Sequence, residues 1–185
     1  MQTSVTEAEE KRYAELQLMA LDFARNGETR LLASMLKAGL PPNLSDARAN
    51  SLLMLASYNG HAETTRMLLE YGAEVDRRND HGQTPLGGAA FKGYEDIVAL
   101  LLEHGADIDA DNGVGMTPIM FAAMFGRAQV VEQLRARGAS LKRRNRLGLS
   151  ARAMVALSRL VTRLCRRNRG SRRLGPEGHH EACSR

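Results

Sequence analysis

Three acidic residues alternate along the chain as in the first half of a calcium-binding loop. Asp107, Asp109 and Asp111 follow the D-x-D-x-D spacing with which such a loop begins. The loop also requires Gly at its sixth position and Glu at its twelfth, where this chain has Asn112 and Pro118. The spacing therefore argues against a calcium site at these residues.

The histidines and cysteines do not combine into a metal or catalytic site either. His179, His180 and Cys183 are close in sequence, but a structural zinc ion normally takes four protein ligands. The other three histidines stand far apart, at His61, His81 and His104. None of them has a nucleophile or carboxylate at a spacing that implies joint action, and the glycines do not cluster as in a phosphate-binding loop. We therefore expect no enzyme activity, no metal ion and no cofactor.

The charged residues are distributed unevenly along the 185-residue chain. Its net charge is +5, yet residues 141–185 hold thirteen Lys and Arg against two Glu, a net charge of +11, which leaves −6 for residues 1–140. Clustered arginines can hold the phosphates of a nucleic acid or an anionic membrane surface. The candidate anion-binding residues are Arg163, Arg166, Arg167, Arg169, Arg172 and Arg173. The alternatives are a solubilising end cap, or docking on an acidic protein or on the acidic body of the chain itself.

The overall composition is that of a globular protein, with 43% hydrophobic and 25% charged residues. The length corresponds to one domain, and two cysteines cannot build a disulfide-stapled scaffold. No stretch approaches the ~20 apolar residues of a membrane span. Glu7, Glu9 and Glu10 stand where a secretory signal has basic and then apolar residues. We therefore expect a cytoplasmic protein.

The elements that would hold any site recur every 33 residues. Three sets of positions keep this period: Gly27, Gly60, Gly93 and Gly126; Gly39, Gly72, Gly105 and Gly138; and Ala49, Gly82, Gly115 and Gly148. Thr84-Pro85-Leu86 recurs in the same way as Thr117-Pro118-Ile119. Thr followed by Pro is typical of a helix start, and Gly in the left-handed conformation often ends a helix. The period therefore predicts units of two helices, which must stack to bury their apolar faces.

These motifs resemble the ankyrin repeat, whose unit carries a T-P-L-H-x-A-A motif, a glycine near its middle and a G-A-D close. The resemblance covers about residues 14–158 and implies an all-α solenoid of stacked helix-turn-helix units with short hairpin loops. We expect an acidic extension (1–13), repeat units at about 14–45, 46–78, 79–111 and 112–144, a closing helix (145–168) and a basic, disordered tail (169–185). A stack of about four units should fold as a monomer.

The chain departs from this motif in two places and changes character in its closing unit. The histidine after T-P-L, which makes a hydrogen bond to the neighbouring turn in the family, is replaced by Gly87 and Met120. The side chains missing at Gly87 and Gly88 either make room for Phe121 or Leu55 of the adjoining repeats, or leave a shallow notch for a partner side chain. In the closing unit Arg159 stands where earlier units have a helix-ending glycine, so this unit forms either one long helix or two.

The resemblance also implies non-enzymatic binding of another protein through the concave inner helices and the hairpin tips. The positions of this surface are Arg48, Asn50, Tyr58, Asn59, Asp80, His81, Gln83, Phe91, Lys92, Val114, Met116, Met124 and Phe125, with Arg146 and Leu149 from the closing hairpin. Tyr58, Phe91 and Phe125 stand out because aromatic residues are the usual anchors of an interface, and the chain has only four Tyr, four Phe and no Trp. Alternatively, these rings pack sideways on neighbouring repeats.

Overall fold

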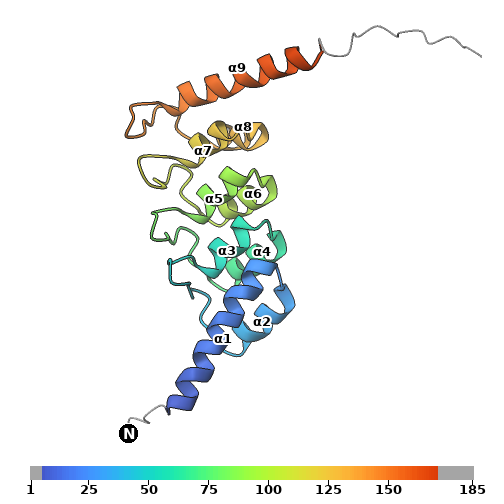
Figure 1. The fold of residues 1–185 in the computed structure, drawn as a ribbon, viewed down its shortest axis with the longest axis vertical. Coiled ribbons are helices and arrows are strands. Elements are labelled where there is room, and N and C mark those ends of the chain that lie inside the picture. Colours follow the sequence, from blue (N-terminus) through green and yellow to red (C-terminus); the bar gives the residue numbers. More distant parts are fainter. Residues whose placement is uncertain (1–5, 171–185) are drawn as a thin grey trace, which may run out of the picture.

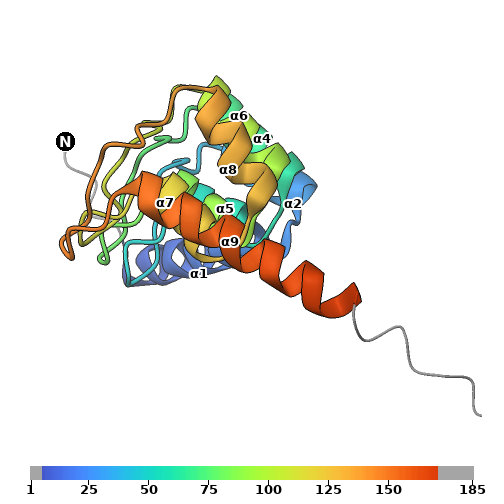
Figure 2. The same ribbon diagram turned by 90° about the horizontal axis from the view of Figure 1, so that it is seen from above.

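The computed structural model describes residues 6–170, with side chains described as far as residue 160. Nine α-helices and no β-strand form within this range, and they ascend from α1 to α9 in one stack (Figure 1). The view from above shows two layers of helices, with the hairpin loops along one side (Figure 2). The inner layer contains α1 (Glu7–Asn26), α3 (Leu52–Tyr58), α5 (Pro85–Lys92), α7 (Pro118–Met124) and α9 (Ala151–Gly170). The outer layer contains α2 (Thr29–Lys37), α4 (Ala62–Glu70), α6 (Glu95–Glu103) and α8 (Ala128–Ala136).

Each helix contacts the helix of the same layer in the next unit, as α3 does with α5 and α4 with α6. Within a unit the two helices also contact each other, as α5 does with α6. This arrangement confirms the predicted all-α solenoid. None of the helices within residues 6–170 combines the length and the apolar character needed to cross a lipid bilayer.

The third unit shows how the sequence sets the ends of a helix. Thr84 has an extended backbone, and its hydroxyl oxygen accepts a hydrogen bond from the Gly87 N–H at 3.1 Å, so one of the free amides of the first turn is satisfied. Pro85 follows at the first helical position, where a missing N–H has no cost. Gly93 ends α5 with a φ of +90°, a conformation that residues with a Cβ rarely adopt.

The core lies between the two layers and runs the length of the stack. Its completely buried aliphatic side chains come from both layers and include Leu53, Leu68, Leu86, Ile97, Leu101, Ile119 and Leu134. Burial of such a side chain stabilises the fold by about 1.5–3 kcal/mol. Ala151 and Val155 of α9 are buried as well, so this helix covers the last apolar face, that of α7.

A ladder of side-chain to backbone hydrogen bonds connects each unit to the next on the loop side. Asn43 Oδ1 accepts from the Glu74 N–H at 2.8 Å. The second rung joins Asp76 Oδ2 to the Asp107 N–H at 2.9 Å, and the third joins Asp109 Oδ1 to the Ser140 N–H at 2.9 Å. Among the alternating aspartates, Asp109 therefore has a structural role through its side chain, while Asp107 takes part through its backbone N–H.

The space left by Gly87 is filled by the neighbouring hairpin. A Cβ added at Gly87 would lie 2.0 Å from Asn112 Oδ1, so the expectation that Phe121 or Leu55 occupies this space is wrong. The Asn112 side chain is 3% exposed, and its Oδ1 accepts from the Thr84 N–H at 2.7 Å and from the Thr84 hydroxyl at 2.9 Å. A hydrogen bond between the unit and the neighbouring turn therefore exists here without the histidine: Thr84 supplies the donors and Asn112 of the turn supplies the acceptor.

The fourth unit fills the corresponding space with a side chain of its own. Met120 is completely buried where the third unit has Gly87, and Asn145 stays in its own hairpin, where its Oδ1 accepts from the Leu147 and Leu149 N–H groups at 3.0 Å. The Thr117 hydroxyl, which corresponds to that of Thr84, is buried and has no hydrogen-bond partner among the described residues. Two units with nearly the same sequence motif thus differ in how they satisfy their polar groups.

The inward turn of Asn112 changes the tip of its hairpin. In the hairpin before it, Asn79 Oδ1 accepts from two tip amides, whereas here Asp111 Oδ1 accepts from the Gly115 N–H at 3.0 Å. Val114 adopts a φ of +52°, which is an outlier for a β-branched residue. Its side chain is 56% exposed at the tip.

Within the described residues, the closing unit forms one long helix, α9, with no break at Arg159. In the earlier units, a side chain from the next unit lies over each helix-ending glycine: a Cβ added at Gly27 would meet His61, and one at Gly93 would meet Arg127. Among the described residues, nothing lies within 4 Å of the corresponding position at Gly126, because α9 continues past this point. The helix therefore projects beyond the stack (Figure 2).

Candidate functional site

A groove of about 730 Å³ runs along the concave side of the stack. One wall consists of hairpin residues, among them Asn50, His81 and Gln83, and the other of residues from α3, α5 and α7. Gly87 and Gly88 contribute to the lining between these walls. The volume lies within the range of ligand-binding clefts in proteins.

Four rings from the three helices form a continuous aromatic cluster in the groove: Tyr58, Phe91, Phe121 and Phe125. The rings of Tyr58 and Phe91 lie nearly parallel, with centroids 6.2 Å apart, and Phe125 lies edge-on to Phe91 at 4.3 Å. Such contacts between rings contribute about 0.5–1.5 kcal/mol beyond burial. Tyr58 remains 39% exposed and Phe125 43% exposed. The rings therefore hold one another across repeats and still offer apolar surface to the groove.

Two further features fix the position of Tyr58. A Cβ added at Gly88 would lie 3.2 Å from Tyr58 Cδ2, so the glycine lets the ring lie close to α5. The Lys92 ammonium lies 4.6 Å from the centroid of the Tyr58 ring, in a cation–π contact. Lys92 therefore adds a positive charge beside the aromatic cluster.

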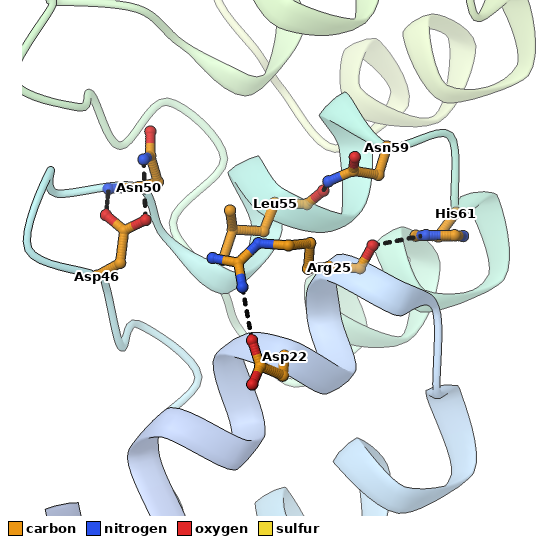
Figure 3. A network of polar contacts seen from close by, with 7 residues as sticks. All are labelled: Asp22, Arg25, Asp46, Asn50, Leu55, Asn59 and His61. Atoms are coloured by element: carbon orange, nitrogen blue, oxygen red, sulfur yellow. Dashed lines mark hydrogen bonds and ion pairs between the residues drawn. The ribbon is translucent and has the colours of Figure 1, made fainter.

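The N-terminal end of the groove is polar and well connected (Figure 3). Asp46 accepts hydrogen bonds from the Arg48 N–H, the Asn50 N–H and the Asn50 side-chain amide at 2.9–3.0 Å. Burial raises the pKa of the Asp46 carboxyl, but the bonds from Asn50 and Arg48 outweigh this effect and hold the pKa below its usual value. This carboxylate is therefore occupied by its own hairpin.

The remaining polar groups at this end are paired as well (Figure 3). Arg25 forms an ion pair with Asp22 at 2.6 Å, and His61 Nε2 lies 2.9 Å from the Arg25 carbonyl oxygen. The Asn59 amide donates to the Leu55 carbonyl at 2.8 Å. These contacts give the groove a preformed polar end next to its aromatic cluster.

The comparisons with known proteins agree with this architecture. A family model described as three copies of the ankyrin repeat matches residues 20–112, and a model of a single ankyrin repeat matches residues 114–146. The chain belongs to the ankyrin-repeat family. Ankyrin repeats generally mediate protein–protein interaction and are typically not enzymes.

Individual ankyrin proteins resemble only parts of the chain. An ankyrin repeat protein of Pseudomonas aeruginosa is 54% identical over 46 residues, which cover 25% of this chain and 27% of that protein. The human oxysterol-binding protein-related protein 1 is 41% identical over 88 residues, 46% of this chain and 9% of the relative. An ankyrin repeat-containing protein of Treponema pallidum is 40% identical over 63 residues, 34% of this chain and 21% of the relative. The chain thus covers less than a third of the length of each of these relatives.

The ankyrin groove brings together most of the residues that the sequence assigned to a binding surface. Those that line it are Arg48, Asn50, Tyr58, Asn59, His81, Gln83, Phe91, Met124 and Phe125. Asp80 and Val114 are exposed near the hairpin tips, and Lys92 lies over Tyr58. The surface assignment of Met116 is wrong: its side chain is 6% exposed, and its sulfur lies 3.6 Å from Asn145 Nδ2 of the next hairpin.

The lining residues that were not anticipated include Arg25, Asp46, Asn79 and Phe121. Asn79 lies exactly one period after Asp46, so the repeat register could have identified this pair. Phe121 corresponds in register to Gly88 and Leu55, and only the packing of α7 on α5 shows that its ring reaches the groove.

The candidate metal ligands and the candidate anion-binding arginines lie partly outside the described residues. Within the described part of the ankyrin chain, no group of three or more His, Cys, Asp or Glu side chains is arranged to hold a metal ion. Arg163, Arg166, Arg167 and Arg169 belong to α9, but their side chains lie outside the described ones. The remaining candidates of the C-terminal segment lie outside the described residues altogether: Arg172, Arg173, His179, His180 and Cys183.

Proposed function

We propose that this ankyrin stack is a non-enzymatic scaffold that binds one partner protein in its concave groove and against its hairpin tips. The observation that carries the proposal is the aromatic cluster, because Tyr58 and Phe125 present apolar surface inside a preformed groove. Aromatic residues near the centre of an interface commonly account for most of its binding energy.

The contacts between the rings favour binding in a second way. Phe91 contacts Tyr58 on one side and Phe125 on the other, so the three rings are held in place before a partner arrives. Binding to a preorganised surface avoids the entropy cost of ordering each side chain, about 0.5–1.5 kcal/mol for a rotamer-rich one. The polar hairpin residues around the rings, such as Asn50 and Gln83, would then select among partners by hydrogen bonding.

Affinity capture with the unsubstituted protein and two variants tests this function. Full-length protein is compared with a variant that combines Tyr58→Ala, Phe91→Ala and Phe125→Ala. We expect the triple variant to lose the partners captured from a native lysate while its helical circular dichroism stays unchanged. Tyr13→Ala serves as a matched control, because Tyr13 is 46% exposed and lies on α1 outside the groove. Capture by the folded triple variant at the level of the unsubstituted protein would rule out the groove as the binding site.

The second candidate function is binding of nucleic acid or an anionic membrane surface by the basic C-terminal segment. It is favoured by the exposed cations Lys142, Arg143 and Arg152, none of which forms an ion pair with another described side chain. Truncation after Asn168 combined with Lys142→Glu, Arg143→Glu and Arg152→Glu separates the two functions, since groove partners should be retained and partners of the basic segment lost. Binding to duplex DNA or RNA that does not weaken steeply with added salt would contradict a phosphate-based interaction.

A further inference from the structure

The geometry points to a second, apolar half of the binding surface on the closing unit, suited to a partner segment that carries acidic residues beside apolar ones. This inference rests on the proposed function and specifies the chemistry of the partner. It follows from the repeat register, the exposed side chains and the distribution of charge in residues 112–160.

The helix wall of the groove continues onto α9. Tyr58, Phe91 and Met124 occupy the same position of consecutive units, and Leu157 follows one period later. Met124 is 52% exposed and Leu157 62% exposed, and α9 packs directly on α7. An apolar line therefore extends from the aromatic cluster to the last helix.

The hairpin wall changes character over the same units. Arg48 and His81 are followed at the same position by Val114 and Leu147, and Leu147 is 83% exposed. The Arg146 N–H donates to the Val114 carbonyl at 2.9 Å, which holds the last two tips together. The tips thus pass from polar in the second and third units to apolar in the fourth and fifth.

Positive charge surrounds this apolar half. Residues 141–160 contain six cationic side chains and no acidic one: Lys142, Arg143, Arg144, Arg146, Arg152 and Arg159. Arg159 is paired with Glu132 of α8, while Arg146 stands beside the apolar tip residue Leu147. A partner segment with Asp or Glu next to its apolar residues complements this combination of surfaces.

The shape of the surface favours a protein segment over a flat or a phosphate-rich partner. The groove of the second to fourth units has two walls, the hairpins and the inner helices. The closing unit continues both elements, with its hairpin on the same side of the stack (Figure 2), and this arrangement suits a single segment of chain better than a flat bilayer. Nucleic-acid interfaces are predominantly polar and charged, and exposed Leu147 and Leu157 do not suit them. An acidic, apolar peptide fits both the walls and their charge.

Selection from a random peptide library on the immobilised full-length protein tests the inference. We expect the selected peptides to be enriched in Asp and Glu adjacent to Leu, Ile or Phe, and to bind less tightly as salt is added. Leu149 is 48% exposed in the same hairpin as Leu147 and is in register with Asn50 and Gln83 of the groove. Leu149→Ser combined with Leu157→Ser should weaken the best peptide by about tenfold or more. Leu160→Ser is the control, because Leu160 is 54% exposed on the same helix but lies out of register with the groove line. Arg146→Glu should weaken acidic peptides and leave the circular dichroism unchanged.

The outcomes separate this inference from the proposed function. Peptides without an acidic preference would overturn the inference. Peptides that fail to bind the Tyr58, Phe91 and Phe125 triple variant but bind the Leu149 and Leu157 double variant normally would also overturn the inference. In that case the proposed function would stand. Peptides insensitive to both variants would count against both. Phosphatidylserine vesicles, duplex DNA or a second copy of the chain binding in a way that depends on Leu157 would assign the surface to that partner and also overturn the inference.

Discussion

Thr84 and Thr117 occupy the same position of neighbouring repeats, but their hydroxyl groups have different surroundings. Both residues have extended backbones at the start of a helix and are essentially buried. The Thr84 hydroxyl accepts from the Gly87 N–H and donates to Asn112 Oδ1, while that of Thr117 has no partner among the described residues. Replacement of each by Val, which has nearly the same shape, isolates the contribution of the hydroxyl.

The expected effects differ in size and can differ in sign. Thr84→Val removes an N-cap hydrogen bond, which contributes about 1–2 kcal/mol, and a second bond of about 0.5–1.5 kcal/mol. We expect its free energy of unfolding to fall by about 2–3 kcal/mol. Thr117→Val removes a hydroxyl that is desolvated without compensation, so stability should be unchanged or rise by up to about 1 kcal/mol. The folding equilibria of the two variants should therefore differ by about 30-fold or more.

Urea unfolding followed by circular dichroism, together with thermal unfolding, measures both variants. In a chain of this size, the loss at Thr84 corresponds to a fall in Tm of about 4–12 °C. Thr84→Ser keeps the hydroxyl and should retain most of the lost stability, which separates hydrogen bonding from packing. Equal destabilisation by Thr84→Val and Thr117→Val would refute the assignment of different hydrogen-bond states to the two positions.

Three further predictions concern single positions. Gly87→Ala should lower the free energy of unfolding by about 2 kcal/mol or more because its Cβ overlaps a buried amide. Gly88→Ala should cost little, because its Cβ would lie 3.2 Å from the part-exposed Tyr58 ring and alanine is favoured over glycine within a helix; urea unfolding compares the two variants. The hydrogen bond from Arg159 lowers the pKa of Glu132. The pair therefore stabilises the fold above the usual glutamate pKa, and this effect is lost as the pH falls through the lowered value. Glu132→Gln should cost at most about 1 kcal/mol at neutral pH and nothing in acid, as unfolding across a pH series would show. Ala49→Gly should raise the Tm, because the φ of +58° at Ala49 costs alanine about 1 kcal/mol and costs glycine nothing. An unchanged or lower Tm would contradict this.

The repeat period was sufficient to predict the fold and the general location of the groove. Its glycines mark helix ends and the Thr-Pro motifs mark helix starts, so the helix boundaries can be identified from local sequence motifs alone. The same register placed Tyr58 and Phe91 on one line of the concave side, where they line the groove. Phe125 lies one residue after that line, and its ring nevertheless contacts Phe91 at 4.3 Å.

The sequence could not predict which side chains fill the spaces between units. Gly87 signals an empty space, but the residue that enters it, Asn112, comes from a hairpin whose tip must change conformation to release it. Met116 was assigned to the surface by its register with Asn50 and Gln83, and it is buried by contact with the next hairpin. Both differences arise from contacts between units, which spacing within one unit does not encode.

The Gly87–Asn112 contact also restricts how these two positions can evolve. A side chain at position 87 would collide with the amide of Asn112, and removal of that amide would leave the buried Thr84 N–H without an acceptor. Either change alone is harmful, yet the pair Met120 and Asn145 shows that a large residue and an outward-facing amide are compatible in the next unit. The two positions should therefore be energetically coupled: a large residue at position 87 requires Asn112 to turn outward, so loss of the Asn112 side chain should cost less stability in the Gly87→Met background than beside Gly87.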